Sequence, residues 1–131
     1  MMRTLIIAFL VLQGCGVLIW WGIVLVSPQA RALFVAPGAP DSTLLAFLGA
    51  DLLLYAGGSL VSAYGLAGGR GWAWTALCIH TGAAVYAALY GLALPLFSGG
   101  AWLGALLMCP SLIVLPFVLW HVGQERKHAS S

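Results

Sequence analysis

The residue best placed to do chemistry is Asp51, which stands in the apolar stretch AFLGADLLLYAGG. A carboxyl group near the middle of a membrane-spanning helix costs about 2.5–3.5 kcal/mol to insert, so it faces a protein interior or water and is a functional candidate. Such a group can hold a ligand by hydrogen bonds or act as an acid or base. The alternative is a structural hydrogen bond between two helices.

Helical spacing places Tyr55, Gly58 and Ser62 on the same face as Asp51, and Gly65 continues this stripe. The stripe is small or polar on a helix that is otherwise rich in leucine. Such a face turns toward a neighbouring helix or a cavity rather than toward lipid. We therefore predict that Tyr55, Gly58 and Ser62 contact any ligand held by Asp51.

Two tyrosines are the predicted hydrogen-bond partners of Asp51. Counting outward from the tight turn near Gly69 places Asp51 level with a point between Tyr86 and Tyr90 of the next apolar segment. We predict that one of the two tyrosine hydroxyls donates to the carboxyl group. Asp51, Tyr86 and Tyr90 are accordingly the candidate catalytic residues.

The first apolar segment adds three candidate ligand contacts. Trp20 and Trp21 lie nearly level with Asp51 and are expected to wall a lipophilic pocket beside it. Gln13 is flanked by glycines, and we expect it to form an interhelical hydrogen bond or to contact the ligand.

His80 lies about 10 Å along the helix axis from the level of Asp51, so we expect no direct dyad between them. It is either a structural histidine bonded to a backbone carbonyl or a nearby serine, or a further ligand contact. Bis-histidine haem is not expected, because His121 and His128 lie too far toward the end of the chain to share its depth. Cys15, Cys78 and Cys109 lie in three different apolar segments and form no spacing typical of metal ligands. We therefore predict no metal site, and we also predict no cofactor.

The elements that position these residues follow from composition. The chain has 131 residues, of which 63% are hydrophobic and 6% are charged, with a mean hydropathy of +1.06. A soluble domain has about a quarter of its residues charged, and a membrane span needs about 20 apolar residues. We predict an all-α integral membrane four-helix bundle forming a single transmembrane domain, with spans at about 4–26, 43–67, 72–97 and 101–120, an outer loop at 27–42 and a frayed polar tail at 121–131.

The connections predict how the spans are arranged. The stretch SPQARALFVAPGAPDST is an extramembrane loop that can hold one short surface helix, and Asp41 or Ser42 can cap the span that follows. The glycine-rich turns GGRG and SGG are short, so the spans they join are antiparallel. The result is up-down topology. The first apolar run is longer than a signal-peptide core, and we expect it to be retained as a helix.

Basic residues predict the orientation. With both termini on one side, that side carries most of the lysine and arginine, namely Arg3, Arg70, Arg126 and Lys127, against Arg31 alone on the other side. Positive charge favours the cytoplasmic side. We therefore expect both termini to be cytoplasmic, with the chain in a plasma (inner) membrane.

Three functions are compatible with these features. The favoured one is a protein that holds a lipophilic molecule, such as an isoprenoid, a quinone, a sterol-like compound or a fatty chain, around Asp51, with acid–base chemistry such as isomerisation as an extension. The alternatives are an accessory subunit of a larger membrane complex and a small proton-coupled transporter, which would need a homo-oligomer. A net charge of +2 is too small for a nucleic-acid partner. The partner expected from the apolar composition is the lipid bilayer.

Overall fold

The computed structural model describes residues 1–129, which are helical throughout apart from the connections, with 84% helix and no strand in this range. The long elements are α1 (Met2–Val26), α6 (Ala73–Ser98) and α7 (Trp102–Ala129). The shorter ones are α2 (Pro28–Ala32), α3 (Ser42–Leu45), α4 (Leu48–Ala50), the π-helical turn η1 (Asp51–Gly57) and α5 (Gly58–Ala67). Within residues 1–129, four helical segments are long and apolar enough to cross a membrane, namely Met2–Val26, Ser42–Ala67, Ala73–Ser98 and Trp102–His128.

The predicted spans agree closely with these segments except at the C-terminus. Gly99 ends α6 in the left-handed conformation that favours glycine, with φ of 73°. The expectation of a frayed tail is wrong for the described residues, because α7 continues to Ala129. The guanidinium of Arg126 lies 5.3 Å from the centre of the Trp74 ring, so this polar extension still contacts the bundle. Residues 130–131 of the predicted tail lie outside the described range.

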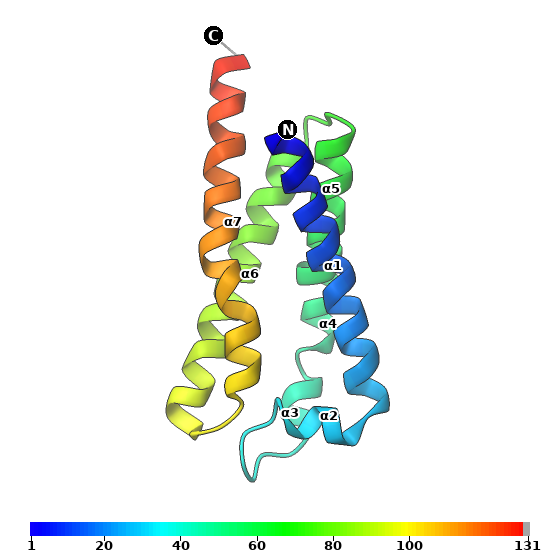
Figure 1. The fold of residues 1–131 in the computed structure, drawn as a ribbon, viewed down its shortest axis with the longest axis vertical. Helices are drawn as coiled ribbons and strands as arrows, with labels where there is room; N and C mark the ends of the chain where they lie inside the picture. The colour runs from blue at the N-terminus through cyan, green and yellow to red at the C-terminus, as the bar shows by residue number, and fades with distance from the viewer. Residues whose placement is uncertain (130–131) are drawn as a thin grey trace.

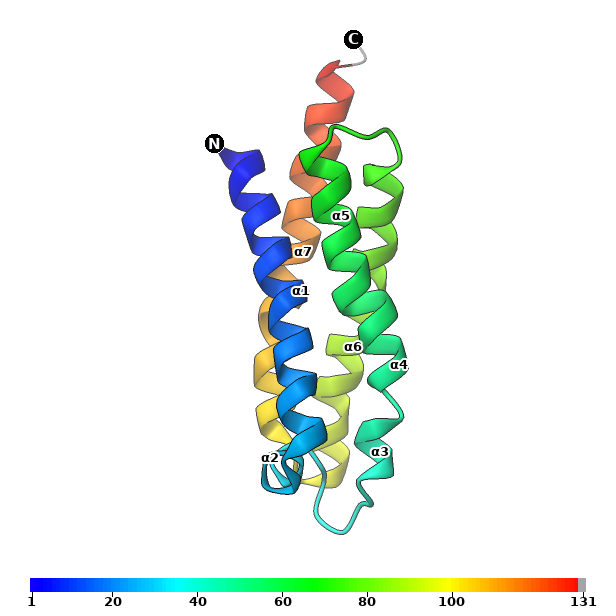
Figure 2. The same ribbon diagram turned by 90° about the vertical axis from the view of Figure 1, so that its right-hand side faces the viewer.

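The helices form an elongated bundle in which α1 packs along α5 and η1, α5 packs on α6, and α6 packs along α7. The first residues of α1 and the last of α7 lie toward one end of the bundle, and the loop between α2 and α3 lies at the other (Figure 1). Figure 2 shows the same arrangement from the side of α5 and α4. We refer to these as the terminal end and the loop end.

Close packing between α5 and its neighbours depends on glycine. A Cβ added at Gly58 would lie 3.2 Å from His80 Nδ1, and one at Gly65 would lie 2.9 Å from the Cβ of Ala73. A Cβ at Gly14 would lie 2.7 Å from Leu60. These glycines let α5 approach α1 and α6 closely, as small residues do between membrane helices.

The π-helical turn corrects the predicted stripe on the second segment. Asp51 and Tyr55 are buried as expected, but both belong to the wider turn η1, which rotates the face of α5 that follows. Ser59 is fully buried, whereas Gly58 is only partly buried. The inward polar stripe therefore runs through Asp51, Tyr55, Ser59 and Ser62.

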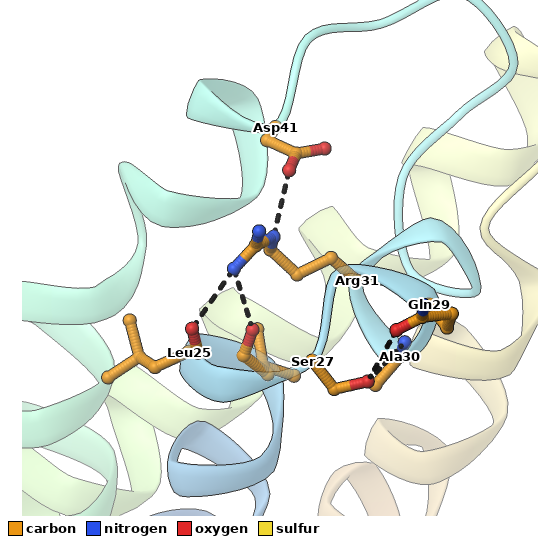
Figure 3. A network of polar contacts seen from close by, with 7 residues as sticks. Leu25, Ser27, Gln29, Ala30, Arg31 and Asp41 are labelled. Atoms are coloured by element: carbon orange, nitrogen blue, oxygen red, sulfur yellow. Dashed lines mark hydrogen bonds and ion pairs between the residues drawn. The ribbon is translucent and has the colours of Figure 1, made fainter.

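The loop end is held together by Arg31, which belongs to the predicted short helix α2 (Figure 3). Its Nε lies 2.8 Å from Asp41 Oδ2, and its Nη1 donates to the carbonyls of Val24 and Leu25, both at 3.1 Å. Asp41 precedes α3 but its side chain does not cap that helix. The expected cap is absent because this carboxylate binds Arg31 instead.

Candidate functional site

A cavity of about 750 Å³ lies between the helices on the loop-end side of the molecule. Residues of α1, the loop, η1, α6 and α7 line it, and most of them are apolar, including Val17, Phe34, Phe47, Leu54, Ala83, Ala87, Leu94 and Met108. Six of the predicted site residues reach this cavity, namely Gln13, Trp20, Asp51, Tyr55, Tyr86 and Tyr90. The structure thus gathers residues from three of the predicted spans around one apolar space.

Asp51 lies on the cavity wall, and 6% of its surface is exposed. Its Oδ2 accepts a hydrogen bond from Trp21 Nε1 at 3.2 Å. The prediction of a tyrosine donor to Asp51 is wrong, because within residues 1–129 neither Tyr86 nor Tyr90 donates to this carboxyl group. Counting residues gave the level of α6 beside Asp51 but not its rotation, and the two tyrosines lie on a largely exposed face that borders the cavity.

The two tryptophans have different roles. Trp21 is 1% exposed and binds Asp51 from behind the cavity wall. Trp20 lines the cavity, with its ring centre 4.7 Å from that of Trp21 and 5.1 Å from that of Phe34. The Trp20 Nε1 is buried and has no hydrogen-bond partner in the described part of the chain.

Gln13 is the centre of a polar cluster at the inner end of the cavity. One side of its amide lies 3.1 Å from the Tyr55 hydroxyl and 3.2 Å from the Ser111 hydroxyl. The other side lies 3.1 Å from Ser59 Oγ and 3.2 Å from His80 Nε2. The hydroxyls of Tyr55 and Ser111 are also hydrogen-bonded to each other. The cluster joins α1, η1, α5, α6 and α7, and the interhelical role predicted for Gln13 is confirmed.

His80 is fully buried and lies behind this cluster rather than on the cavity wall. Its Nδ1 donates to the carbonyl of Leu54 at 3.2 Å, which is the predicted alternative of a histidine bound to a backbone carbonyl. Gly58 leaves room for the imidazole ring. Ser62 does not bind it, because its hydroxyl donates to the carbonyl of Gly58 at 2.7 Å.

Two polar residues of the cluster were not predicted. Ser59 follows the π-helical turn, and a uniform α-helical spacing directs it away from the stripe. Ser111 follows Pro110 in a segment that has no ionisable residue, so the sequence offered only its hydroxyl group as a signal. Both are 5% exposed or less. Gly58, Ser62, Trp21 and His80 support the cavity from outside its lining.

No group of three or more histidine, cysteine, aspartate or glutamate side chains within residues 1–129 is placed to hold a metal ion. The polar groups at the cavity are instead a carboxyl, an amide, an indole and several hydroxyls. Together they can orient the polar end of a molecule whose remaining surface is apolar.

The chain matches no protein-family model, no curated protein and no solved structure.

Proposed function

We propose that this protein spans a membrane and holds one lipophilic small molecule in the cavity beside Asp51. The observation that carries the proposal is the cavity itself, with its volume of about 750 Å³, apolar walls and a small set of polar groups. Ligand sites in proteins have volumes of about 300–1,000 Å³ and the same mixture of apolar lining and few polar groups. An elongated apolar molecule with a polar end group suits such a site.

The proposed orientation has all four segments in the bilayer in up-down order and both termini in the cytoplasm. Arg3, Arg70 and Arg126 belong to the terminal end, and Arg31 belongs to the loop end. The greater positive charge at the terminal end supports its cytoplasmic position in a plasma (inner) membrane. The cavity then opens in the outer half of the bilayer.

Asp51 is proposed to bind the ligand rather than to perform acid–base catalysis. Its carboxyl group has a single described donor, Trp21, and no tyrosine hydroxyl is bonded to it for proton transfer. Tyr86 and Tyr90 are proposed as wall residues on the same grounds. The alternative functions are isomerisation, proton-coupled transport and an accessory role, which a measured reaction, a flux or a co-purifying partner would identify.

The test fills the cavity and measures what the purified protein retains. Ala87 lines the cavity, whereas Ala8 is exposed on α1 and lies outside the lining, so Ala87→Phe and Ala8→Phe add the same side chain at a test and a control position. Each protein is purified in mild detergent, and its organic extract is examined by mass spectrometry. We expect wild type and Ala8→Phe to retain one lipophilic compound in near-stoichiometric amount, and Ala87→Phe to lose it.

Equal retention by folded Ala87→Phe and wild type would contradict the proposal. Absence of any compound from folded wild type would count against a tightly held ligand and favour the accessory or transport function. Asp51→Asn in the same series measures the contribution of the carboxyl group to ligand retention. We expect this substitution to reduce the amount of ligand retained while the protein still folds.

A further inference from the structure

The hydrogen atoms available around Gln13 restrict how its amide is oriented. Ser59 Oγ lies 2.8 Å from the carbonyl oxygen of Leu10, which can only accept, so the single hydroxyl proton is committed there. The same Ser59 Oγ lies 3.1 Å from the atom assigned as the Gln13 amide oxygen. One proton makes a well-directed hydrogen bond to only one of two such acceptors, and the shorter contact is the one to Leu10. With the amide in that orientation, two oxygen atoms face each other with no hydrogen between them.

His80 meets the same difficulty. Its Nδ1 faces the Leu54 carbonyl and must carry a proton. If Nε2 also faced an amide oxygen, at 3.2 Å, both ring nitrogens would need protons and the ring would be a cation. His80 is fully buried, and its described partners are a carbonyl and an amide, with no carboxylate among them. An unpaired buried charge is strongly disfavoured.

Rotation of the Gln13 amide by half a turn removes both conflicts at once. The amide nitrogen and oxygen occupy nearly the same space, so the rotation keeps the surrounding distances. The nitrogen then donates one hydrogen to Ser59 Oγ and the other to His80 Nε2. His80 is neutral with its proton on Nδ1, and every atom on this side of the cluster has a partner.

This assignment determines what the cavity offers to a ligand. The Gln13 oxygen now faces Tyr55 and Ser111, whose two hydroxyls also bind each other. One hydroxyl proton lies between Tyr55 and Ser111, and the other binds the Gln13 oxygen. Both protons are used inside the cluster, and the groups that remain for a ligand are oxygen lone pairs.

We infer that the inner end of the cavity is built from hydrogen-bond acceptors and therefore selects a lipophilic alcohol, whose single hydroxyl proton is donated to one of the oxygen atoms of Gln13, Tyr55 and Ser111. An aldehyde, ether or carboxylate brings only further acceptors to this end. An ammonium group is disfavoured because it would lose its hydrating water and gain only neutral hydrogen-bond partners, with no opposite charge. The inference rests on the proposed binding function and names the class of molecule that this same site takes.

The buried N–H of Trp20 on the cavity wall lies too far from Gln13 to change this selection. Trp20 is seven residues from Gln13 on α1, which corresponds to about 10 Å along the helix axis. Its buried Nε1 can therefore serve an acceptor atom further along a ligand but not the end group at Gln13. The direction of the ligand follows, with its hydroxyl toward the centre of the bundle and its chain toward the loop end.

The first part of the test reads the His80 tautomer and needs no ligand. Nitrogen-15 NMR of histidine-labelled protein, with His80→Gln to assign the signal, is expected to show a neutral ring with the proton on Nδ1. A doubly protonated ring, or a proton on Nε2 alone, would overturn the amide assignment.

The second part compares end groups on one hydrocarbon chain. Farnesol, farnesyl methyl ether and farnesal are titrated into protein in one detergent, with Ala87→Phe giving the background from partition into micelles. We expect farnesol to bind about tenfold more tightly than the ether or the aldehyde, because those leave the acceptors at Gln13 unpaired. Equal affinity of the three probes would overturn the inference while leaving the proposed binding function intact. Failure of all three to bind above background would contradict the binding function for this class of chain.

Tyr55→Phe provides a variant that keeps the ring and removes one acceptor. The Ser111 hydroxyl still binds the Gln13 oxygen, and the bonds of His80 to Gln13 and Leu54 are untouched. We expect the preference for farnesol over its ether to fall several-fold while the His80 tautomer stays unchanged. An unchanged preference would contradict the contribution assigned to Tyr55.

Discussion

Trp20 and Trp21 are neighbours in sequence, yet only one of their two indole N–H groups has a hydrogen-bond partner within the described chain. Trp21 donates to Asp51 at 3.2 Å, whereas the Trp20 Nε1 has no described partner. Substituting each of the two residues therefore distinguishes the stability contributed by the hydrogen bond from the stability contributed by the indole ring. It also gives a matched test of how Asp51 is held.

We predict that Trp21→Phe lowers the stability of the protein by about 1–3 kcal/mol more than Trp20→Phe does, because only the first change leaves a buried carboxyl group without its donor. Thermal unfolding of both variants in the same detergent measures the difference. Equal shifts in melting temperature would show that the Trp21–Asp51 bond contributes nothing beyond the loss of ring volume.

At this scale, the sequence identified most of the site residues but not their bonds. Asp51, Gln13 and Trp20 were predicted at the site because a polar or aromatic residue in an apolar segment is conspicuous. The donor to Asp51 was predicted wrongly, since residue counting gives depth but not the rotation of each helix. Ser111 was missed because a serine in a membrane segment can bind its own backbone and needs no partner elsewhere.

At the scale of elements, glycine decides where helices come close. An added Cβ at Gly65 would lie 2.9 Å from the Cβ of Ala73, which α6 holds in place, whereas one at Gly22 meets nothing within 4 Å. We predict that Gly65→Ala destabilises the protein by about 1–3 kcal/mol through overpacking. Gly22→Ala is the control and is expected to leave the melting temperature unchanged or slightly raised. Equal melting temperatures for the two variants would contradict close packing of α5 on α6.

The loop end gives a second prediction, about Arg31. Asp41→Ala removes one partly exposed ion pair, for which we expect a loss of less than about 1 kcal/mol. Arg31→Ala also removes the donor to the carbonyls of Val24 and Leu25, and we expect about 1–3 kcal/mol. Thermal unfolding of the two variants checks the order. A larger effect from Asp41→Ala would mean that the ion pair, rather than the carbonyl bonds, holds the loop.

The elements were largely predictable because apolar runs and glycine turns mark them directly. The four long segments and the short helix at Pro28–Ala32 follow from the sequence. The π-helical turn does not, since the stretch Asp51–Gly57 has no residue that forbids ordinary α-helical bonding. Its effect is to bring Ser59 rather than Gly58 to the centre of the bundle.

At the scale of the whole molecule, the proposed orientation makes a prediction about its two ends. We expect reporters fused to the N-terminus and to the C-terminus both to be cytoplasmic, because most of the basic residues lie at that end of the bundle. Reporter pairs that are active only in the cytoplasm or only outside it measure this directly. A reporter detected outside at both termini would contradict the proposed orientation, and reporters on opposite sides would contradict the up-down arrangement.

Photo-crosslinking shows whether the cavity near Asp51 holds a lipophilic molecule. A farnesol analogue carrying a diazirine is bound to the purified protein, irradiated, and the labelled residues are identified by mass spectrometry. We expect adducts on cavity-lining residues of α6 and α7, such as Ala83, Leu94 and Met108, which disappear with excess farnesol or in Ala87→Phe but persist in Ala8→Phe. Adducts spread over outward-facing residues such as Leu53 and Ile113, and unaffected by competitor or by Ala87→Phe, would contradict it.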